Sequence, residues 1–221
     1  LMGAIKNMVG TPEKDEAVRL QKEHRISLSA CWTKRFFDVL VSVVGLIFFA
    51  PAFPVIAWLI RREDKGPIIF KQERIGYRGK AFILYKFRSM TVVAESGGPM
   101  LSVKNDKRLT RVGKFLREHH IDELPQLWNV LKGDMSFVGP RPERRYYIDQ
   151  ILALNPDYRL LYQLRPGLFS AATLYNGYTD TMEKMMERLR MDLNYLANRS
   201  LWLDVKIIAL TAWAIISGKK F

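Results

Sequence analysis

Apolar residues dominate the stretch from Val39 to Ile60, whose 22 positions contain no charge and only one polar side chain, Ser42. A straight helix of this length would extend roughly 33 Å, which is enough to cross the hydrocarbon core of a bilayer. Pro51 and Pro54 lie near its middle and remove two backbone donors from such a helix. The pattern therefore predicts a helix that bends sharply near its centre.

Basic residues stand on both sides of the apolar run, Lys34 and Arg35 before it and Arg61 and Arg62 after it. Basic flanks prefer the cytoplasmic side of a membrane, and a single crossing cannot give both flanks that position. A hairpin that enters the membrane and returns satisfies both flanks, whereas a kinked span satisfies only one. The residues alone leave these two arrangements open, with a buried helix of a soluble domain as a third.

Shorter patterns follow the apolar run. Residues 67–90 cluster β-forming side chains between glycine-containing turns and predict two short strands. Residues 94–105, which include Gly97, Gly98 and Pro99, predict a mobile loop. The chain up to residue 33 is polar and of mixed charge, with one weak helical stretch at 11–25, and is expected to be an extension without a core of its own.

Helical periodicity predicts further helices at 109–119, 124–131, 146–164, 180–198 and 201–217. In the second of these, an apolar face is expected from Leu124, Leu127, Trp128 and Leu131, and Gly133 ends the helix. The last is interrupted by Asp204 and Lys206, so we expect it in the core or on a membrane surface rather than across a membrane.

The charge of the chain indicates an anionic partner. The formal net charge is +13, and residues 61–120 hold 15 Lys or Arg against 6 Asp or Glu. Nucleic acid, a phosphate-bearing metabolite and an acidic membrane surface all fit this excess. A single cysteine, Cys31, excludes an internal disulfide, and the three histidines make a zinc site improbable.

The candidate chemistry lies at Asp122 and Glu123, just before the helix expected at 124–131, where an early Pro125 is tolerated. One interpretation is structural: Asp122 caps the helix and Glu123 complements its dipole. The other uses the same geometry, since a carboxylate at a helix N-terminus is held ionised in a field that favours anions. With Arg117 five residues upstream, such a site could hold a phosphate beside a carboxylate nucleophile and a carboxylate metal ligand.

The motifs of this region resemble those of a known family. The segment DELPQLWNVLKGDMSFVGPRP, together with KRFFDVLVSVVGL, KGPIIFKQERIGYRGKAFILYKFRSM, RPG and SLWLDVKII, occurs in the order typical of the bacterial sugar transferases. These are monotopic polyprenyl-phosphate phosphoglycosyltransferases. The resemblance runs from about Lys34 to Lys219.

The resemblance implies a reaction in which a UDP-sugar and undecaprenyl phosphate give undecaprenyl-diphospho-sugar and UMP, which initiates the assembly of a bacterial surface glycan. It implies that Asp122 is the nucleophile, forming a covalent aspartyl-phosphosugar intermediate, and that Glu123 acts with it and holds Mg²⁺. Splitting the transfer into two displacements predicts ping-pong kinetics. The sugar stays open; an N-acetylated amino-sugar is weakly favoured.

The resemblance also implies roles for basic residues and prolines. Five cations match positions that contact substrate phosphates: Lys86, Arg88, Arg117, Arg141 and Arg165. Pro51 matches the family's helix-breaking proline, with Pro54 close behind, which favours the re-entrant hairpin. Two departures stand out, because Ala50 replaces a serine before the breaking proline and the motif after Pro166 and Gly167 diverges. The divergent segment puts the identity of the sugar in doubt.

The expected architecture is an α-rich α/β, membrane-associated protein, with a re-entrant broken helix, a short β element and interfacial helices. Its expected divisions are an extension at 1–33, the membrane helix-break-helix at 34–62 and a cytoplasmic catalytic domain at 63–221. The implied location is the inner membrane of a bacterium, where lipids would be partners and nucleic acid would not. The oligomeric state stays open, a homodimer included.

Two alternatives from other classes remain. A non-catalytic membrane scaffold in a glycan-assembly complex would use the Asp-Glu pair only as a cap, so that Asp122→Asn is silent. A membrane-anchored nucleic-acid binder would use the basic segment, and its affinity for DNA would fall steeply with salt.

Overall fold

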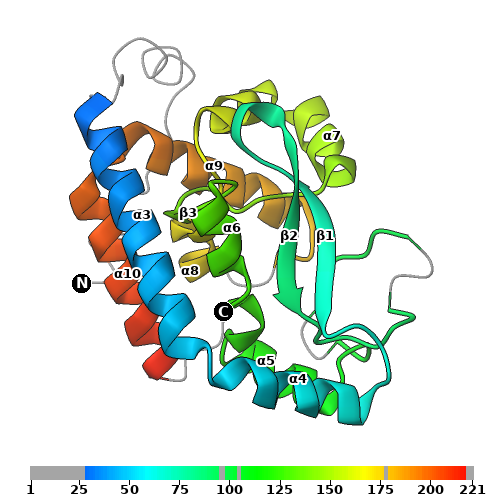
Figure 1. Cartoon of the computed structure of the whole chain (residues 1–221). Coiled ribbons are helices and arrows are strands. Elements are labelled where there is room, and N and C mark those ends of the chain that lie inside the picture. The colour runs from blue at the N-terminus through cyan, green and yellow to red at the C-terminus, as the bar shows by residue number, and fades with distance from the viewer. Residues whose placement is uncertain (1–27, 95–97, 104–105, 177–178, 218–221) are drawn as a thin grey trace.

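The computed structural model describes residues 28–94, 98–103, 106–176 and 179–217, shown as coloured ribbon in Figure 1. The weak helix expected at 11–25 lies outside the described residues. Helix α3 (Leu28–Phe49) starts before the expected division at residue 34, and α4 (Ala52–Glu63) ends one residue after the expected division at residue 62.

Helices α3 and α4 meet at the predicted break, where their axes bend by 63°. The amides of Ala50 and Phe53 donate to the carbonyls of Ile47 and Ala50, each at 3.3 Å. These are the carbonyls that Pro51 and Pro54 deprive of a helical donor, and tighter three-residue bonds replace the missing ones. Within the described residues no single helix is long and apolar enough to cross a membrane, whereas this bent pair passes by length and composition.

The predicted strands form an antiparallel hairpin, β1 (Ile69–Ile75) and β2 (Ala81–Phe87), joined through a 3-10 turn, η1 (Tyr77–Gly79). The turn contains two consecutive residues with positive φ, Arg78 at 57° and Gly79 at 69°. A second sheet, which the sequence did not predict, pairs two three-residue strands in parallel, β3 (Ser136–Val138) and β4 (Gly167–Phe169).

Helices fill the rest of the described chain. Between the hairpin and β3 lie α5 (Arg111–Glu118), the 3-10 turn η2 (Ile121–Glu123) and α6 (Gln126–Lys132). Between β3 and β4 lie α7 (Arg145–Leu154) and the 3-10 segment η3 (Pro156–Gln163), and after β4 come α8 (Ala171–Asn176), α9 (Met182–Asn198) and α10 (Leu201–Ile216).

The helix expected at 146–164 is two segments rather than one. Helix α7 stops at Leu154, and η3 continues from Pro156 in 3-10 geometry, with the Asn155 side chain accepting from the amide of Asp157 at 2.9 Å. Proline disfavours the α conformation in the residue before it and cannot donate, so the helix ends there. The other four expected helices are present, and Gly133 ends α6 with φ 94°.

Three apolar clusters form the core. The first packs α7, η3 and α9 together, and the second joins β2, α6, the parallel strands and α10. The third lies between α4, α5 and the end of β2, where Ile60, Phe87 and Leu116 are buried. In Figure 1, α3 and α10 lie side by side along one edge of the molecule, and α4 and α5 lie beneath the hairpin.

Helix α3 buries polar and small residues and exposes apolar ones. Asp38 and Ser42 are 5% and 0% exposed, while Ile47 and Phe48 are 70% and 74% exposed. The Asp38 carboxylate accepts from the amide of Phe137 in β3 at 3.0 Å, which fixes α3 to the second core cluster. This order of burial is the reverse of an ordinary surface helix.

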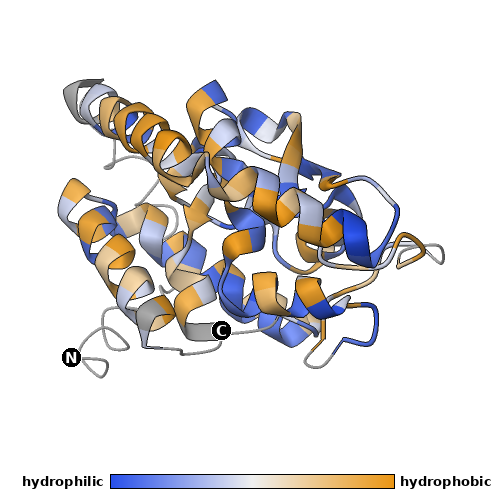
Figure 2. Cartoon of the chain, turned by 60° about the horizontal axis from the view of Figure 1, so that its bottom comes forward, coloured by the Kyte–Doolittle hydropathy of each residue, from blue (hydrophilic) through white to orange (hydrophobic). Residues whose placement is uncertain are grey.

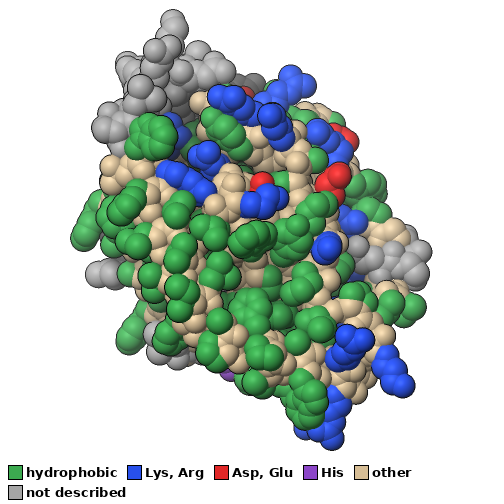
Figure 3. All heavy atoms as spheres, viewed as in Figure 1, with side chains coloured by type: hydrophobic (Ala, Val, Ile, Leu, Met, Phe, Trp, Pro, Cys, Tyr) green, Lys and Arg blue, Asp and Glu red, His purple; other side chains and the backbone are tan. Residues whose placement is uncertain are grey.

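Neighbouring helices also expose large apolar side chains. Trp128 of α6 is 51% exposed although the sequence placed it on the apolar face, and Gln126 and Asn129 are buried along with Leu127 and Val130. Helix α10 buries Asp204 and exposes Trp202. Figure 2 shows hydrophobic residues along these outer helices, and Figure 3 shows one face covered with hydrophobic side chains, with basic ones toward its upper and lower edges. Together these helices form one apolar face of the molecule.

Candidate active site

Asp122 and Glu123 lie in η2, between α5 and α6. The turn follows His120, whose φ of 55° reverses the chain after α5, and the Glu123 amide donates back to the His120 carbonyl at 3.2 Å. Helix α6 starts later, with Pro125 at its N-cap position and no side-chain cap. The structural interpretation of Asp122 as the cap of this helix is therefore wrong, because the carboxylate lies a turn too early.

Two cations reach Glu123 from different parts of the chain. Lys86 Nζ, on β2, lies 2.6 Å from Glu123 Oε1, and Arg141 Nη2, from the loop after β3, lies 3.2 Å from the same oxygen. Asp122 is 2% exposed. The site thus brings two adjacent carboxylates and two predicted cations into one group, in which Asp122 is buried and the other three are partly exposed.

The surroundings shift the pKa values of the two carboxylates in opposite directions. Burial raises the pKa of Asp122 to about 6. The negative charge of Glu123 adds to this rise, and the positive charge of Lys86 opposes it. The pKa of Glu123 is held well below its usual range because Lys86 and Arg141 outweigh its desolvation. Burial also lowers the pKa of Lys86, an effect that Glu123 opposes. Glu123 is therefore the anion that organises the cations, and Asp122 is the less paired of the two.

Arg117 lies in the last turn of α5 and its charge acts on Asp122. Its Nη2 donates to Ser102 Oγ at 3.1 Å, and the buried Nη1 has no hydrogen-bond partner among the described residues. A guanidinium with a free donor beside a carboxylate suits an incoming phosphate oxygen.

Arg88 follows directly after β2 and is 5% exposed. Its Nη2 donates to the Asp64 carbonyl at 2.5 Å, at the end of α4. Gly66 lies against the guanidinium, and a Cβ there would come within 1.6 Å of Nη1. The expectation that Arg88 follows Lys86 along one strand face is met only in part, since β2 ends between them, but both line the same cleft.

Arg165 is not brought to the carboxylates. It is exposed, its Nε donates to the Gly133 carbonyl at 3.0 Å, and its guanidinium lies 5.2 Å from the centre of the Tyr77 ring. It therefore covers the C-terminal end of α6 in this structure, at the opposite end of that helix from Asp122.

A cleft of about 240 Å³ opens beside the carboxylate pair, with Lys86 and Arg117 in its lining. It is lined by β1 and β2, by the segment that follows β2, by described residues of the loop predicted at 94–105, and by the segment after Arg141. Its basic lining residues are Arg74, Lys86, Arg88, Arg108, Arg117 and Arg144. Such a cleft suits a ligand with several negative charges. Arg74, Arg108 and Arg144 carried no sequence signal beyond their charge.

Asn129 is a residue that sequence reasoning missed. It is fully buried in α6, accepts from the amide of Tyr85 at 3.1 Å and donates to the carbonyl of Ile83 at 2.7 Å. These bonds fix β2 against α6, which sets Lys86 opposite Glu123. A buried asparagine in the middle of a helix was the available signal, because buried amides need such partners.

A metal ion could be held by Glu123 with Asp122 beside it. The described residues contain no group of three or more His, Cys, Asp or Glu side chains able to hold a metal. A metal at the pair would therefore take its other ligands from substrate phosphates and water, which is how proteins usually hold Mg²⁺.

The geometry can be set beside known proteins. The family model described as bacterial sugar transferase matches residues 29–218. A UDP-glucose:undecaprenyl-phosphate glucose-1-phosphate transferase from Klebsiella pneumoniae is 45% identical over 182 residues, covering 81% of this chain and 39% of the relative. A UDP-N-acetylgalactosamine-undecaprenyl-phosphate N-acetylgalactosaminephosphotransferase from Aeromonas hydrophila is 42% identical over 185 residues, covering 84% and 44%.

The relatives differ in length. An exopolysaccharide production protein PSS from Rhizobium leguminosarum bv. phaseoli is 41% identical over 195 residues and is matched over 98% of its length, with 85% of this chain covered. By contrast, this chain spans only about two fifths of the Klebsiella and Aeromonas relatives.

Proposed function

The chain belongs to the bacterial sugar transferase family, and on this premise we propose that it transfers a sugar-1-phosphate from a UDP-sugar to undecaprenyl phosphate, releasing UMP. The observation that carries the proposal is the carboxylate pair Asp122–Glu123, of which Asp122 is buried, with Lys86, Arg117 and Arg141 around it and a basic cleft beside it. This arrangement suits two anionic substrates that react in turn. The product would begin a surface glycan.

In the first step, an Asp122 carboxylate oxygen attacks the β-phosphorus of the UDP-sugar. The new Asp122–phosphorus bond forms as the bond to the bridging oxygen breaks, and that oxygen leaves with UMP. Asp122 is the suitable nucleophile because Glu123 already takes the hydrogen bond of Lys86 and the ion pair of Arg141. Arg117 and Arg141 would neutralise charge at phosphorus.

In the second step, an oxygen of undecaprenyl phosphate attacks the same phosphorus. The bond to Asp122 breaks, the carboxylate is regenerated, and the sugar stays on what becomes a diphosphate. Each displacement exchanges one phosphorus–oxygen bond for another, so no oxidant or further reactant is needed. Glu123, with substrate phosphates, would hold Mg²⁺, which when bound draws charge from the phosphate oxygens.

We further propose that the apolar face enters one leaflet of the inner membrane, with the cleft on the cytoplasmic side. The support is the reversed burial of α3, whose exposed side chains include Phe36, Ile47 and Phe48. An exposed apolar surface of this extent marks an interaction site. The bend at Pro51 lets α4 leave the direction of α3, as a re-entrant hairpin requires.

The decisive experiment incubates the purified protein in nanodiscs with Mg²⁺ and UDP-sugars labelled in the β-phosphate. Acid quenching without lipid acceptor should trap label on Asp122, and Asp122→Asn should lower turnover by at least about 10³-fold. Arg165→Ala is the matched control, since its guanidinium lies away from the carboxylates. Unchanged turnover by Asp122→Asn would reject the mechanism and favour the scaffold alternative.

A panel of UDP-glucose, UDP-N-acetylgalactosamine and other UDP-sugars, measured by UMP release, would identify the sugar. Chelation of Mg²⁺ should abolish release and re-addition should restore it. For the membrane arrangement, single cysteines at positions 34 and 62, in a variant lacking Cys31, should be labelled from the same side. Labelling from opposite sides would show a kinked span instead.

A further inference from the structure

One face of the hairpin forms a wall of the cleft. Phe70, Gln72 and Arg74 alternate along β1, so their side chains leave the same face of the strand, and all three line the cleft. Phe70 pairs directly with Lys86 of β2, whose Nζ reaches Glu123. Gln72 lies two residues, about 7 Å, farther along the strand. The wall therefore starts beside the carboxylate pair and extends over a length that one nucleotide can cover.

The amide of Gln72 is held in a fixed orientation. Arg74 Nη1 pairs with Glu143 Oε1, and Arg74 Nη2 donates to Gln72 Oε1, both at 2.5 Å. Glu143 is 5% exposed and also accepts from Arg188 of α9, so the chain of contacts is anchored in the core. Because a guanidinium only donates, Gln72 must turn its oxygen to Arg74 and its NH₂ elsewhere. This NH₂ forms no hydrogen bond with the described residues, so the cleft wall offers an oriented, unused donor.

Phe70 supplies a flat apolar surface next to this donor. Its side chain is 37% exposed and belongs to none of the three apolar clusters that the described residues form. An aromatic ring of this kind can stack on the face of any nucleotide base. The hydrogen bond from a neighbouring amide then favours a base that presents a carbonyl oxygen. Together with the cations of the cleft, these two groups suit a phosphorylated nucleoside.

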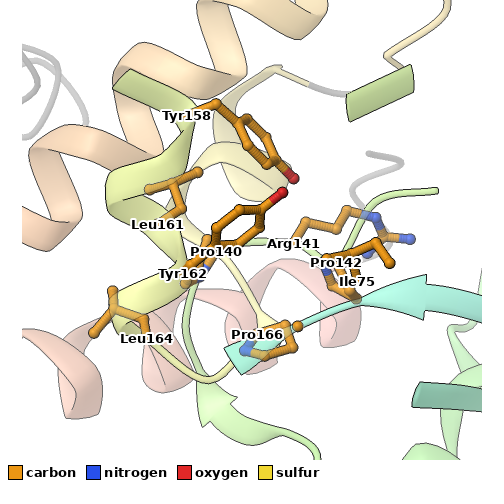
Figure 4. Close-up of a pocket in the computed structure, with 10 residues that line it drawn as sticks. Ile75, Pro140, Arg141, Pro142, Tyr158, Leu161, Tyr162, Leu164 and Pro166 are labelled. Carbon is orange, nitrogen blue, oxygen red and sulfur yellow. The ribbon is translucent and has the colours of Figure 1, made fainter. Parts of the chain in front are cut away.

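A second hollow with aromatic walls is too small for a base. It lies behind the segment 140–142, is lined by Tyr158 and Tyr162, and measures about 20 Å³, which is room for about one water molecule. Figure 4 shows that the Arg141 side chain extends away from both tyrosine rings. The cleft along β1 is therefore where a nucleotide fits.

We propose that Phe70 and Gln72 form the subsite for the base of the UDP-sugar. The uracil ring stacks on Phe70, and one of its carbonyl oxygens accepts from the Gln72 NH₂, while the phosphates extend to Lys86 and Arg117. This inference rests on the proposed function. The contacts through Arg74 and Glu143 orient the donor before the ligand arrives, which lowers the entropic cost of binding.

The test measures the affinity of the full chain in nanodiscs for UDP, with Mg²⁺ present, by equilibrium dialysis. Phe70→Ala should weaken UDP binding about tenfold or more, because base stacking is lost. Gln72→Met, which keeps the length of the side chain but removes the donor, should weaken it about fivefold to tenfold. An affinity within twofold of the wild type in either variant would overturn the proposal.

Inorganic pyrophosphate separates the base from the phosphates, because it carries only the latter. Measured by competition with labelled UDP, it should bind Phe70→Ala and Gln72→Met as tightly as the wild type. An equal loss of pyrophosphate and UDP affinity would overturn the proposal, since it would show that the substitutions disturb the cationic groups of the cleft, Arg74 included.

Ile83→Ala is the matched control. Ile83 is 38% exposed, as Phe70 is 37% exposed, but it pairs with Glu73 and so lies on the opposite face of the same hairpin. This variant should bind UDP as the wild type does. A loss as large as that of Phe70→Ala would assign the effect to the hairpin as a whole and overturn the base contact.

Release of UMP from UDP-sugars distinguishes this inference from the proposed function. A wild type that releases UMP, with both variants binding UDP normally, would reject the base subsite alone. A wild type that binds UDP through Phe70 and Gln72 but releases no UMP from any UDP-sugar would reject the proposed function and leave the subsite in place.

Discussion

Helices α3 and α9 bury opposite kinds of side chain. Helix α9 places Met185, Leu189 and Leu193 in the core and exposes charged residues such as Glu187 and Arg190. Helix α3 does the reverse, with Asp38 and Ser42 buried and phenylalanine, valine and isoleucine exposed. The two helices therefore present different surfaces, α9 a charged one and α3 an apolar one.

The difference extends to the use of polar groups. In α9 the buried charges reach other elements: Arg188 donates to Glu143, and Asp192 accepts from Ser170. In α3 polar side chains make the contact themselves: buried Asp38 accepts from Phe137, and half-buried Arg35 donates to the carbonyls of Val130 and Leu131 at 2.6 and 2.9 Å. Hydrogen bonds from Arg35 and to Asp38 thus join α3 to α6 and β3, beside the apolar contact of Leu46 with the second core cluster.

Removing one apolar side chain from each helix should give the largest difference between α9 and α3. Leu189→Ala in α9 should lower the free energy of unfolding by about 2–5 kcal/mol, because Leu189 is 2% exposed and a cavity forms. Ile47→Ala in α3 should change it by less than about 0.5 kcal/mol. Denaturant unfolding in detergent measures both. Similar losses would show that α3 packs as an ordinary core helix.

Low pH should lower the free energy of unfolding by weakening the ion pair between Glu143 and Arg188 of α9. The pKa of Glu143 is lowered to about 2 because Arg188 and Arg74 outweigh its desolvation. Since this folded-state pKa lies below the ordinary 4.5, the contribution to stability is complete above about pH 4.5 and disappears as the pH falls toward 2. The loss should approach about 3 kcal/mol.

Unfolding measured between pH 6 and pH 2.5 would show this loss, and Glu143→Gln should flatten the profile over that interval while lowering stability throughout. A profile that is equally steep in Glu143→Gln would assign the acid sensitivity to another carboxyl group.

The smallest expected effect concerns membrane binding. Phe48→Ala should weaken partition into anionic lipid vesicles by about 1–2 kcal/mol, roughly tenfold, because one large apolar side chain no longer enters the lipid. Arg190→Ala, on the water-facing side of α9, should leave partition unchanged. Vesicle co-sedimentation compares the two variants. Equal partition of both would show that the apolar face does not contact the membrane.

Local sequence signals predicted part of the fold. Proline spacing predicted the break between α3 and α4, and β-forming clusters predicted the hairpin. These two features depend on neighbours within a few residues, whose conformational preferences act wherever the segment lies. The grouping of the carboxylate pair with Lys86, Arg117 and Arg141 was expected instead from the resemblance to the family's motifs.

Other features escaped because their partners lie far along the chain. The apolar face predicted for α6 included Trp128, yet that residue is exposed, since the helix packs through Gln126, Leu127 and Asn129. Arg165 fitted a family motif but caps the other end of α6. No local pattern could reveal these outcomes, because each depends on which surface a distant helix covers.

By itself, the sequence determined the break at Pro51, where charge gathers and which two carboxylates stand together, since bond geometry and side-chain chemistry act locally. Only the tertiary structure decided that Lys86 and Arg141, 37 and 18 residues from Glu123, meet at one oxygen. It likewise decided that Arg188 of α9 meets Glu143, two residues after Arg141. Such meetings are set by packing, where burial and hydrogen bonding must be satisfied throughout the molecule at once.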